Sequence, residues 1–198
     1  LMHSPVKNEK ETAELMGKFS MLLRQVTRWT SEFVRVSEEV ESVRAYLDIQ
    51  KSRFGERLIW SVYVQEGTEK LYIPKFSIMT FVENACIHGI EPQIHGGSIS
   101  VAVTSDEECI YVEVIDDGCG MPEKTLEELR EKIKNASIED LSKAKSIGIL
   151  NTVVRLKLYF AEAVEVEIDS TSGEGTELFI KIPRKEQDKN VEDQGNAC

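Results

Sequence analysis

Residues 81–90 read FVENACIHGI, a stretch in which polar side chains interrupt the pattern of a buried helix. Apolar residues recur at three- and four-residue spacing along this part of the chain, so we expect a helix from Pro74 to His88 that packs one face on a sheet. We expect Pro74 to open this helix and Gly89 to end it. The packing face consists of Met79, Val82, Ala85, Cys86, Gly89 and Ile90.

The opposite face of this helix carries the polar side chains. Thr80, Asn84 and His88 are four residues apart and therefore lie above one another, with Glu83 at the edge of their stripe. A solvated helix face would explain Glu83 and His88. It would not explain why the apolar Phe81 and Ile87 flank the stripe, and these two favour a wall that is partly covered.

Outward from this helix, the sequence predicts strands on both sides. Short runs rich in β-branched and aromatic residues indicate strands at 58–64, 98–104, 110–115, 164–169 and 177–182. A charged segment at 122–146 holds a short amphipathic helix, and another helix is expected at 148–160. The resulting order α, α, β, α, β, β, lid, α, β, β predicts an α/β two-layer sandwich with a mixed sheet.

The N-terminal region shows a heptad-like pattern of apolar residues. One seam runs from Leu15 to Phe33 and a second from Val36 to Phe54, which predicts two helices. They either form a hairpin stem that supports a dimer, which we favour, or pack on the following domain. The start Leu-Met-His suggests a fragment of a longer protein. The polar tail 184–198 is expected to be disordered.

Composition restricts the classes of protein that fit. The 198 residues are 41% hydrophobic, yet no window holds the ~18 apolar residues of a membrane span and no signal peptide opens the chain. A net charge of −11 argues against a basic nucleic-acid binder. The cysteines show no metal-binding spacing and are expected to be reduced thiols. They are Cys86, Cys109, Cys119 and Cys198.

Residues 114–121 read VIDDGCGM, a hydrophobic strand that ends in two aspartates and two spaced glycines. Asp116 at the end of a strand could accept hydrogen bonds from an exocyclic amine such as that of adenine. A plain turn is the simpler alternative, since Asp-Gly pairs are common in turns. Neither the dinucleotide-binding nor the Walker glycine pattern is present.

Two further glycine motifs follow. Residues 146–151, SIGILN, place Gly148 at the start of a helix, where free N–H groups suit a phosphate, although an ordinary helix start would look the same. Residues 172–176, SGEGT, form a glycine turn before the last strand, for which a hairpin is the default. The basic residues near the first of these motifs are Lys143, Lys145, Arg155 and Lys157.

Together, four motifs of this chain resemble the N, G1, G2 and G3 boxes of the ATP-binding fold shared by histidine kinases, gyrase, Hsp90 and MutL. In chain order they are E-N-A-x-x-H-G, D-D-G-x-G-M, I-G-I-x-N and S-G-E-G-T. L-L-R at 22–24 and Y-L-D-I-Q-K-S-R-F-G-E-R-L at 46–58 resemble the LytS/YesM-type sensor histidine kinases. The resemblance covers residues 12–183. It implies a Bergerat fold with a mixed five-stranded sheet and three helices. It also implies a stem at 1–55, a catalytic domain at 56–183 and a lid at 122–147.

The resemblance also implies residue roles. Glu83 would be the catalytic base, Asn84 would bind Mg²⁺, His88 would sit near the phosphates of ATP, and Asp116 would read adenine with Thr176 nearby. The remaining nucleotide-binding residues would be Gly118, Gly120, Met121, Ile147, Gly148, Ile149 and Asn151.

The implied activity is transfer of the γ-phosphoryl group of ATP to a histidine and then to a response regulator. The whole protein would be a homodimeric, membrane-anchored sensor with this domain in the cytoplasm and no nucleic-acid partner. The sequence departs from the family at Ser146, where glycine is usual, and none of its three histidines fits the phosphoacceptor motif. We therefore expect ATP binding without self-phosphorylation.

Three alternatives remain open on the sequence alone. The first is a nucleotide-binding module without kinase activity, which Ser146 mildly favours. The second is an ATPase of the gyrase or Hsp90 kind, in which a further domain would follow the last strand. The third is a serine kinase of the anti-sigma type, which would lack the heptad stem.

Overall fold

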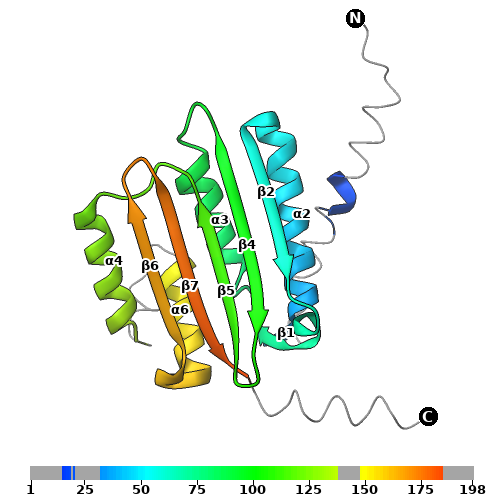
Figure 1. The fold of residues 1–198 in the computed structure, drawn as a ribbon, viewed down its shortest axis with the longest axis vertical. Coiled ribbons are helices and arrows are strands. Elements are labelled where there is room, and N and C mark those ends of the chain that lie inside the picture. The colour runs from blue at the N-terminus through cyan, green and yellow to red at the C-terminus, as the bar shows by residue number, and fades with distance from the viewer. Residues whose placement is uncertain (1–14, 19, 21–31, 138–147, 185–198) are drawn as a thin grey trace, which may run out of the picture.

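The computed structural model describes residues 15–18, 20, 32–137 and 148–184, and Figure 1 shows their arrangement. Most of the expected first stem helix, part of the expected lid, Ile147 and the expected tail lie outside these ranges. Within them, residues 15–18 are helical, and Lys18 Nζ forms a 2.7 Å ion pair with Asp48.

Five strands form one sheet in the order β2-β4-β5-β7-β6. They are β2 (Leu58–Val64), β4 (Gly97–Ser105), β5 (Cys109–Asp116), β6 (Glu165–Thr171) and β7 (Gly175–Pro183). The pair β2–β4 is parallel and the other pairs are antiparallel, so the sheet is mixed as predicted. Every strand contains most of its predicted range, because two-residue alternation marks the strands clearly.

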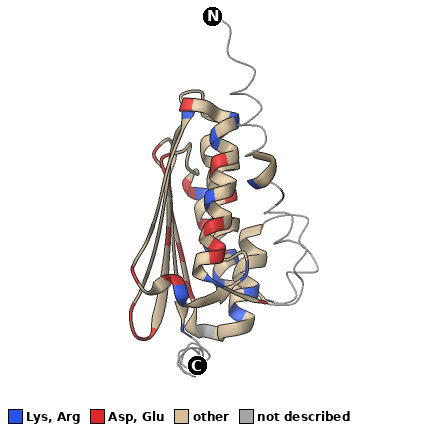
Figure 2. Cartoon of the chain, turned by 90° about the vertical axis from the view of Figure 1, so that its right-hand side faces the viewer, with Lys and Arg blue, Asp and Glu red and all other residues tan. Residues whose placement is uncertain are grey.

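Helices cover only one face of the sheet, as Figure 2 shows. They are α2 (Val36–Phe54), α3 (Met79–Asn84) with a continuing π-helical turn (Ala85–Ile90), and α6 (Gly148–Phe160). The core lies between the two layers, where alternate strand residues such as Val101, Val112 and Ile180 are at most 2% exposed. The predicted α/β two-layer sandwich is therefore confirmed.

Helix α2 packs on this domain. Its seam residues Val36, Val43 and Leu47 are fully buried and belong to the same apolar cluster as the sheet. For this helix, packing on the following domain is thus the alternative that the structure bears out. The dimer-stem hypothesis and the division of the chain at residue 55 stay predictions.

A second, two-stranded sheet was not predicted. Strand β1 (Phe33–Arg35) pairs antiparallel with β3 (Tyr72–Pro74), and Phe33 meets the ring of Tyr159 on α6 at 4.9 Å. The expectation that Phe33 continues a helix was therefore wrong. Three-residue strands carry too little pattern to be recognised without their partner.

The helix of the opening stretch begins at Met79, five residues later than expected, because Pro74 ends β3 instead. Glu39 of α2 supplies the missing start signal. Its buried carboxylate accepts the backbone N–H groups of Phe76, Ile78 and Met79 at 3.1–3.2 Å. A distant carboxylate thus satisfies donors that a local cap would otherwise take. The helical turn ends at Ile90, one residue past Gly89, near which the end was expected.

The amphipathic helix expected in the lid is α4 (Glu123–Asn135). It lies beside the edge strand β6 (Figure 1), and its apolar residues Leu126 and Ile133 are 1% and 5% exposed. The described part of the lid is therefore packed against the domain.

Candidate functional site

A cavity of about 370 Å³ lies between α3, the strands β5 and β7, and α4. This volume falls in the range of small-molecule sites. It brings together residues from all four sequence motifs, which are far apart in the chain. The predicted site residues that line it are Asn84, His88, Asp116, Gly120, Met121, Ile149 and Thr176.

Asp116 is the buried acid of this cavity, with 6% of its surface exposed. Its Oδ1 accepts the N–H of Gly118 at 2.9 Å, and the backbone N–H of Thr176 also donates to the carboxylate. Burial raises the pKa of Asp116 to about 6, although the Gly118 amide acts in the opposite direction. A carboxylate held at the end of a strand by backbone amides has a fixed direction and can accept a further donor from a ligand.

Two glycines let the chain approach this carboxylate. A Cβ atom on Gly89 would lie 2.5 Å from Asp116 Oδ1, and one on Gly118 would clash with the backbone of Gly89. Gly89 therefore serves close packing rather than helix termination. Gly118 does not itself line the cavity but fixes its floor.

Ser170 on β6 supports the floor of the cavity, a role that the sequence did not reveal. Its buried hydroxyl accepts the N–H of Met121 at 2.9 Å, donates to the carbonyl of Gly175 at 2.7 Å and lies 3.1 Å from Thr176 Oγ1. It thereby ties two glycine motifs together across the floor of the cavity. A lone serine in a strand carries no signal that would mark this role.

Helices α3 and α6 meet at the cavity through small polar contacts. Thr152 Oγ1 donates to Thr80 Oγ1 at 3.1 Å, so Thr80 is buried rather than solvated. The Cβ position of Gly148 lies 4.0 Å from Asn84 Nδ2, which brings the start of α6 beside the opening stretch. A helix N-terminus at this place suits an anion.

In the side-chain amide of Asn84, the nitrogen is hydrogen-bonded and the oxygen is available to a ligand. Its Nδ2 donates to the carbonyl of Thr80 at 2.6 Å, and no group in the described part of the chain donates a hydrogen bond to its Oδ1; Asn84 also lines the cavity. A single amide oxygen fits Mg²⁺, which takes few protein ligands and keeps waters and phosphate oxygens. Within the described ranges there is no cluster of three or more His, Cys, Asp or Glu that could hold a metal ion by itself.

Four predicted residues do not line the cavity. Besides Gly118 and Gly148, these are Glu83 and Asn151, which are both exposed. Glu83 neighbours Asn84 in the chain, and partial burial raises the pKa of its carboxyl. Ile147 lies outside the described residues.

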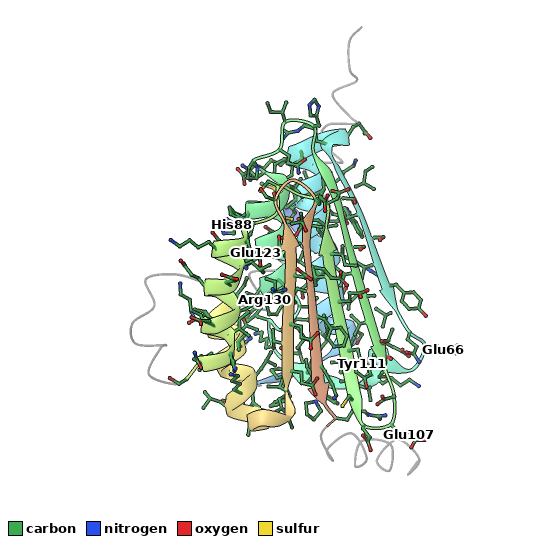
Figure 3. All side chains as sticks on the ribbon, turned by 60° about the vertical axis from the view of Figure 1, so that its left-hand side comes forward. Glu66, His88, Glu107, Tyr111, Glu123 and Arg130 are labelled. Atoms are coloured by element: carbon green, nitrogen blue, oxygen red, sulfur yellow. The ribbon has the colours of Figure 1, made fainter. Side chains whose placement is uncertain are left out.

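The rim of the cavity carries His88, which is exposed and labelled in Figure 3. Its carbonyl accepts the thiol of Cys119 at 2.9 Å, and Cys119 N–H donates to the carbonyl of Gly89 at 3.0 Å. These contacts join the first motif to the second. Cys86, Cys109 and Cys119 are all free thiols, as expected.

One wall of the cavity was not predicted residue by residue. Helix α4 contributes Thr125, Glu128, Leu129 and Lys132. Their spacing of three, four and seven places them on one helix face. The sequence marked this segment as a lid but gave no reason to choose these residues.

The profile of the family described as "Histidine kinase-, DNA gyrase B-, and HSP90-like ATPase" matches residues 76–186, and one described as "Histidine kinase" matches residues 2–58. The chain is 27% identical over 88% of its length to the sensor histidine kinase YesM of Bacillus subtilis. It is 27% identical over 77% of its length to the sensor protein LytS of Bacillus cereus, and 23% identical over 91% to the sensor histidine kinase BtsS of Escherichia coli. The chain spans only 25–29% of the length of these relatives.

Solved structures resemble the fold. The histidine kinase domain of the blue-light activated kinase of Erythrobacter litoralis aligns with a TM-score of 0.54 and 14% identity, over 92% of this chain and 79% of that one. The catalytic domain of histidine kinase ThkA aligns with a TM-score of 0.53 and 18% identity, over 78% of this chain and 99% of that one.

No helix in the described part of the chain is both long and apolar enough to cross a membrane. Three observations lead to one assignment. They are the order of the strands, the cavity between the sheet, the helices and the lid, and a family profile that matches more than half of the chain. This chain belongs to the family of histidine kinase-, DNA gyrase B- and HSP90-like ATPases and carries its ATP-binding domain.

Proposed function

We propose that this chain is the ATP-binding catalytic part of a two-component sensor histidine kinase. It would transfer the γ-phosphoryl group of ATP to a histidine of a phosphoacceptor helix, for relay to a response regulator. The observation that carries this proposal is the convergence of Asn84, Asp116 and Thr176 on one cavity beside the start of α6. The similarity to sensor histidine kinases over most of the chain supports the kinase over the other members of the family.

Each residue has a distinct task in this proposal. Asp116 would accept the exocyclic amine of adenine at the floor of the cavity, where Gly118 and Thr176 hold its carboxylate in place. The side-chain amide oxygen of Asn84 would hold Mg²⁺, which would supply positive charge that offsets the charge of the phosphates. The N–H groups at the start of α6, beside Gly148, would receive phosphate oxygens.

Glu83 would act on the acceptor rather than on the nucleotide. It is exposed next to Asn84 in the chain and does not line the cavity, so it would meet the acceptor imidazole from outside the nucleotide pocket. Its raised pKa makes the carboxylate a stronger base toward that imidazole. The acceptor, the response regulator and a homodimeric, membrane-anchored whole protein belong to this same proposal.

A transfer assay with a separately supplied acceptor tests the proposal. The chain would be incubated with Mg²⁺, γ-labelled ATP and the purified phosphoacceptor stem of a related sensor kinase. We expect acid-labile label on the stem and none on the chain itself. Glu83→Gln should lower transfer roughly a hundredfold or more while ATP affinity stays within about twofold, because a general base acts in the chemical step.

Glu127→Gln is the matched control, since Glu127 is exposed on α4 and does not line the cavity. It should transfer like the wild type. If inorganic phosphate is released as fast without the acceptor stem as with it, the protein is instead an ATPase. Tight ATP binding with neither transfer nor hydrolysis would identify a nucleotide-binding module.

A further inference from the structure

The cations near the cavity are distributed differently from what the sequence suggests. Lys157, expected near the phosphates, donates its Nζ to the carbonyls of Ile133 and Lys134 at 2.9 and 2.8 Å. Arg155 is half-buried within range of the charge of Glu39, and burial lowers the pKa of its guanidinium. Neither residue lines the cavity, so neither is available there to a nucleotide.

Lys132 is the cation that the described chain does bring to this cavity. It lies on the face of α4 that also presents Thr125, Glu128 and Leu129. Among the described residues it has no ion pair and no hydrogen-bond partner, whereas Arg130 and Lys157 on the same side of the molecule are both engaged. An unengaged ammonium group at the rim of an otherwise mostly apolar cavity is available to an anionic ligand.

The orientation of α4 is set by contacts on its other faces. Leu126 and Ile133 are buried against the domain. Arg130, labelled in Figure 3, donates its Nε to the carbonyl of Ile168 at 2.9 Å and pairs through Nη2 with Asp169 at 3.1 Å. Lys157 holds the last carbonyls of the helix. Together these contacts fix the rotation of α4 and hence the position of Lys132.

We propose that Lys132 recognises the phosphate chain of the nucleotide and makes the site select adenine nucleotides over adenosine, with Arg130 as the positioning residue that holds α4 against β6. This inference rests on the proposed ATP site. A chain with a net charge of −11 attracts no polyanion by its overall field, so a local cation contributes much of the discrimination. Lys132 is in place before the nucleotide arrives, because α4 already packs on the domain.

Calorimetric titration with adenosine, AMP, ADP and ATP tests this assignment. In Lys132→Gln, ATP affinity should fall roughly tenfold while adenosine affinity changes less than about twofold, since a charge-assisted contact to phosphate is lost and base recognition is kept. Lys124→Gln is the matched control. Lys124 lies on the same helix, is exposed and does not line the cavity, so this variant should bind all four ligands like the wild type.

A second pair of variants tests the role of Arg130. Arg130→Ala should lower the preference for ATP over adenosine about threefold, and Arg130→Lys should restore part of it. In the Lys132→Gln background, Arg130→Ala should have no further effect on this preference, because it acts through Lys132. A purely structural role of Arg130 would instead weaken adenosine and ATP equally.

The outcomes separate this inference from the proposed function. If Lys132→Gln weakens adenosine as much as ATP, or leaves ATP affinity unchanged, the assignment of Lys132 is overturned while the nucleotide site stands. If the wild type binds neither adenosine nor ATP, the proposed function fails and this inference fails with it.

Discussion

The floor and the lid wall of the cavity are built in opposite ways. On the floor, Asp116 and Ser170 are buried, and hydrogen bonds of 2.7–3.1 Å to backbone amides, a backbone carbonyl and a hydroxyl hold their side chains. On the lid wall, Thr125, Glu128 and Lys132 are exposed, and only the opposite faces of α4 are fixed. The floor proposed to bind the base is thus held by its own side-chain hydrogen bonds, whereas the side chains of the lid wall extend from a helix that is held through its other faces.

The free-energy cost of desolvating polar groups explains why the floor is held by more hydrogen bonds than the lid wall. A buried carboxylate must have its hydrogen bonds in place, because desolvation without partners costs several kcal/mol. Exposed charges gain little from each neighbour and tolerate movement. We therefore expect changes on the floor to act on every ligand, and changes on the lid wall to act only on ligands that carry phosphates.

The largest expected effect follows from Asp116→Asn. The variant loses a charge-assisted hydrogen bond to the adenine amine, worth about 1.5–3 kcal/mol, so adenosine and ATP affinities should both fall roughly ten- to a hundredfold. Titration calorimetry measures this loss. Asp117→Asn is the neighbouring control, since Asp117 binds the Ser98 hydroxyl at 2.7 Å rather than lining the cavity, and should change affinity less than about threefold. Equal effects of the two variants would contradict the role of Asp116.

The next effect is a pH dependence. Because the pKa of Asp116 is about 6, its carboxylate is mostly protonated at pH 5, and adenosine affinity should fall about tenfold between pH 7 and 5. Adenosine is the right ligand because it carries no phosphate that titrates in this range. Asp116→Asn should abolish this pH dependence. A wild-type adenosine affinity that stays constant between pH 7 and 5 would contradict the prediction.

Stability should depend on pH in the opposite direction. The pKa of Asp116 lies above its ordinary value of 3.8, so this group stabilises the fold most below about pH 4, and that contribution is lost as the pH rises through about 6. Relative to Asp116→Asn, the ligand-free wild type should therefore gain stability between pH 8 and 5. At about 1.4 kcal/mol for each pKa unit the full contribution is at most about 3 kcal/mol. Denaturant unfolding of both proteins measures it.

A smaller effect is expected from Ser170→Ala. Its loss leaves the partly buried N–H of Met121 and the hydroxyl of Thr176 without this partner. We expect this loss to cost about 1–2 kcal/mol of unfolding free energy and a few-fold in adenosine affinity. Ser100→Ala, on the exposed face of β4, should change neither quantity. Matching behaviour of the two serine variants would show that the floor is not locked as described.

The smallest effect is expected on the lid wall itself. Glu128→Gln removes an exposed negative charge from the rim, so ATP affinity should rise by about twofold and adenosine affinity should stay constant. Raising the salt concentration should erase the gain, since exposed charges are screened. A large loss of adenosine binding would mean that this wall also contacts the base.

Much of the fold could be predicted because its signals are local. The alternation of Leu58–Val64 and the period of Val36–Phe54 correspond to β2 and α2 at the observed bounds. The start of α3 could not be predicted, because Glu39, forty residues before Met79, supplies its capping carboxylate. The three-residue strand β1 was missed for the same reason, since its partner is β3.

The candidate site divides in the same way. The aspartate at a strand end marked Asp116, and the family resemblance added Gly120 and Thr176; all three line the cavity. Ser170, Lys132 and Arg130 could not be chosen, because an isolated serine, lysine or arginine has no pattern. Lys157 was expected near phosphate and instead binds the end of α4.

By itself, the sequence determined the strands, the main helices, the family and the motifs that meet at the nucleotide site, because periodicity and glycine spacing act over a few residues. Only the tertiary structure decided where α3 begins, which cation faces the cavity and how its floor is held. Those features depend on hydrogen bonds and ion pairs between segments tens of residues apart, and such contacts leave no mark on local sequence.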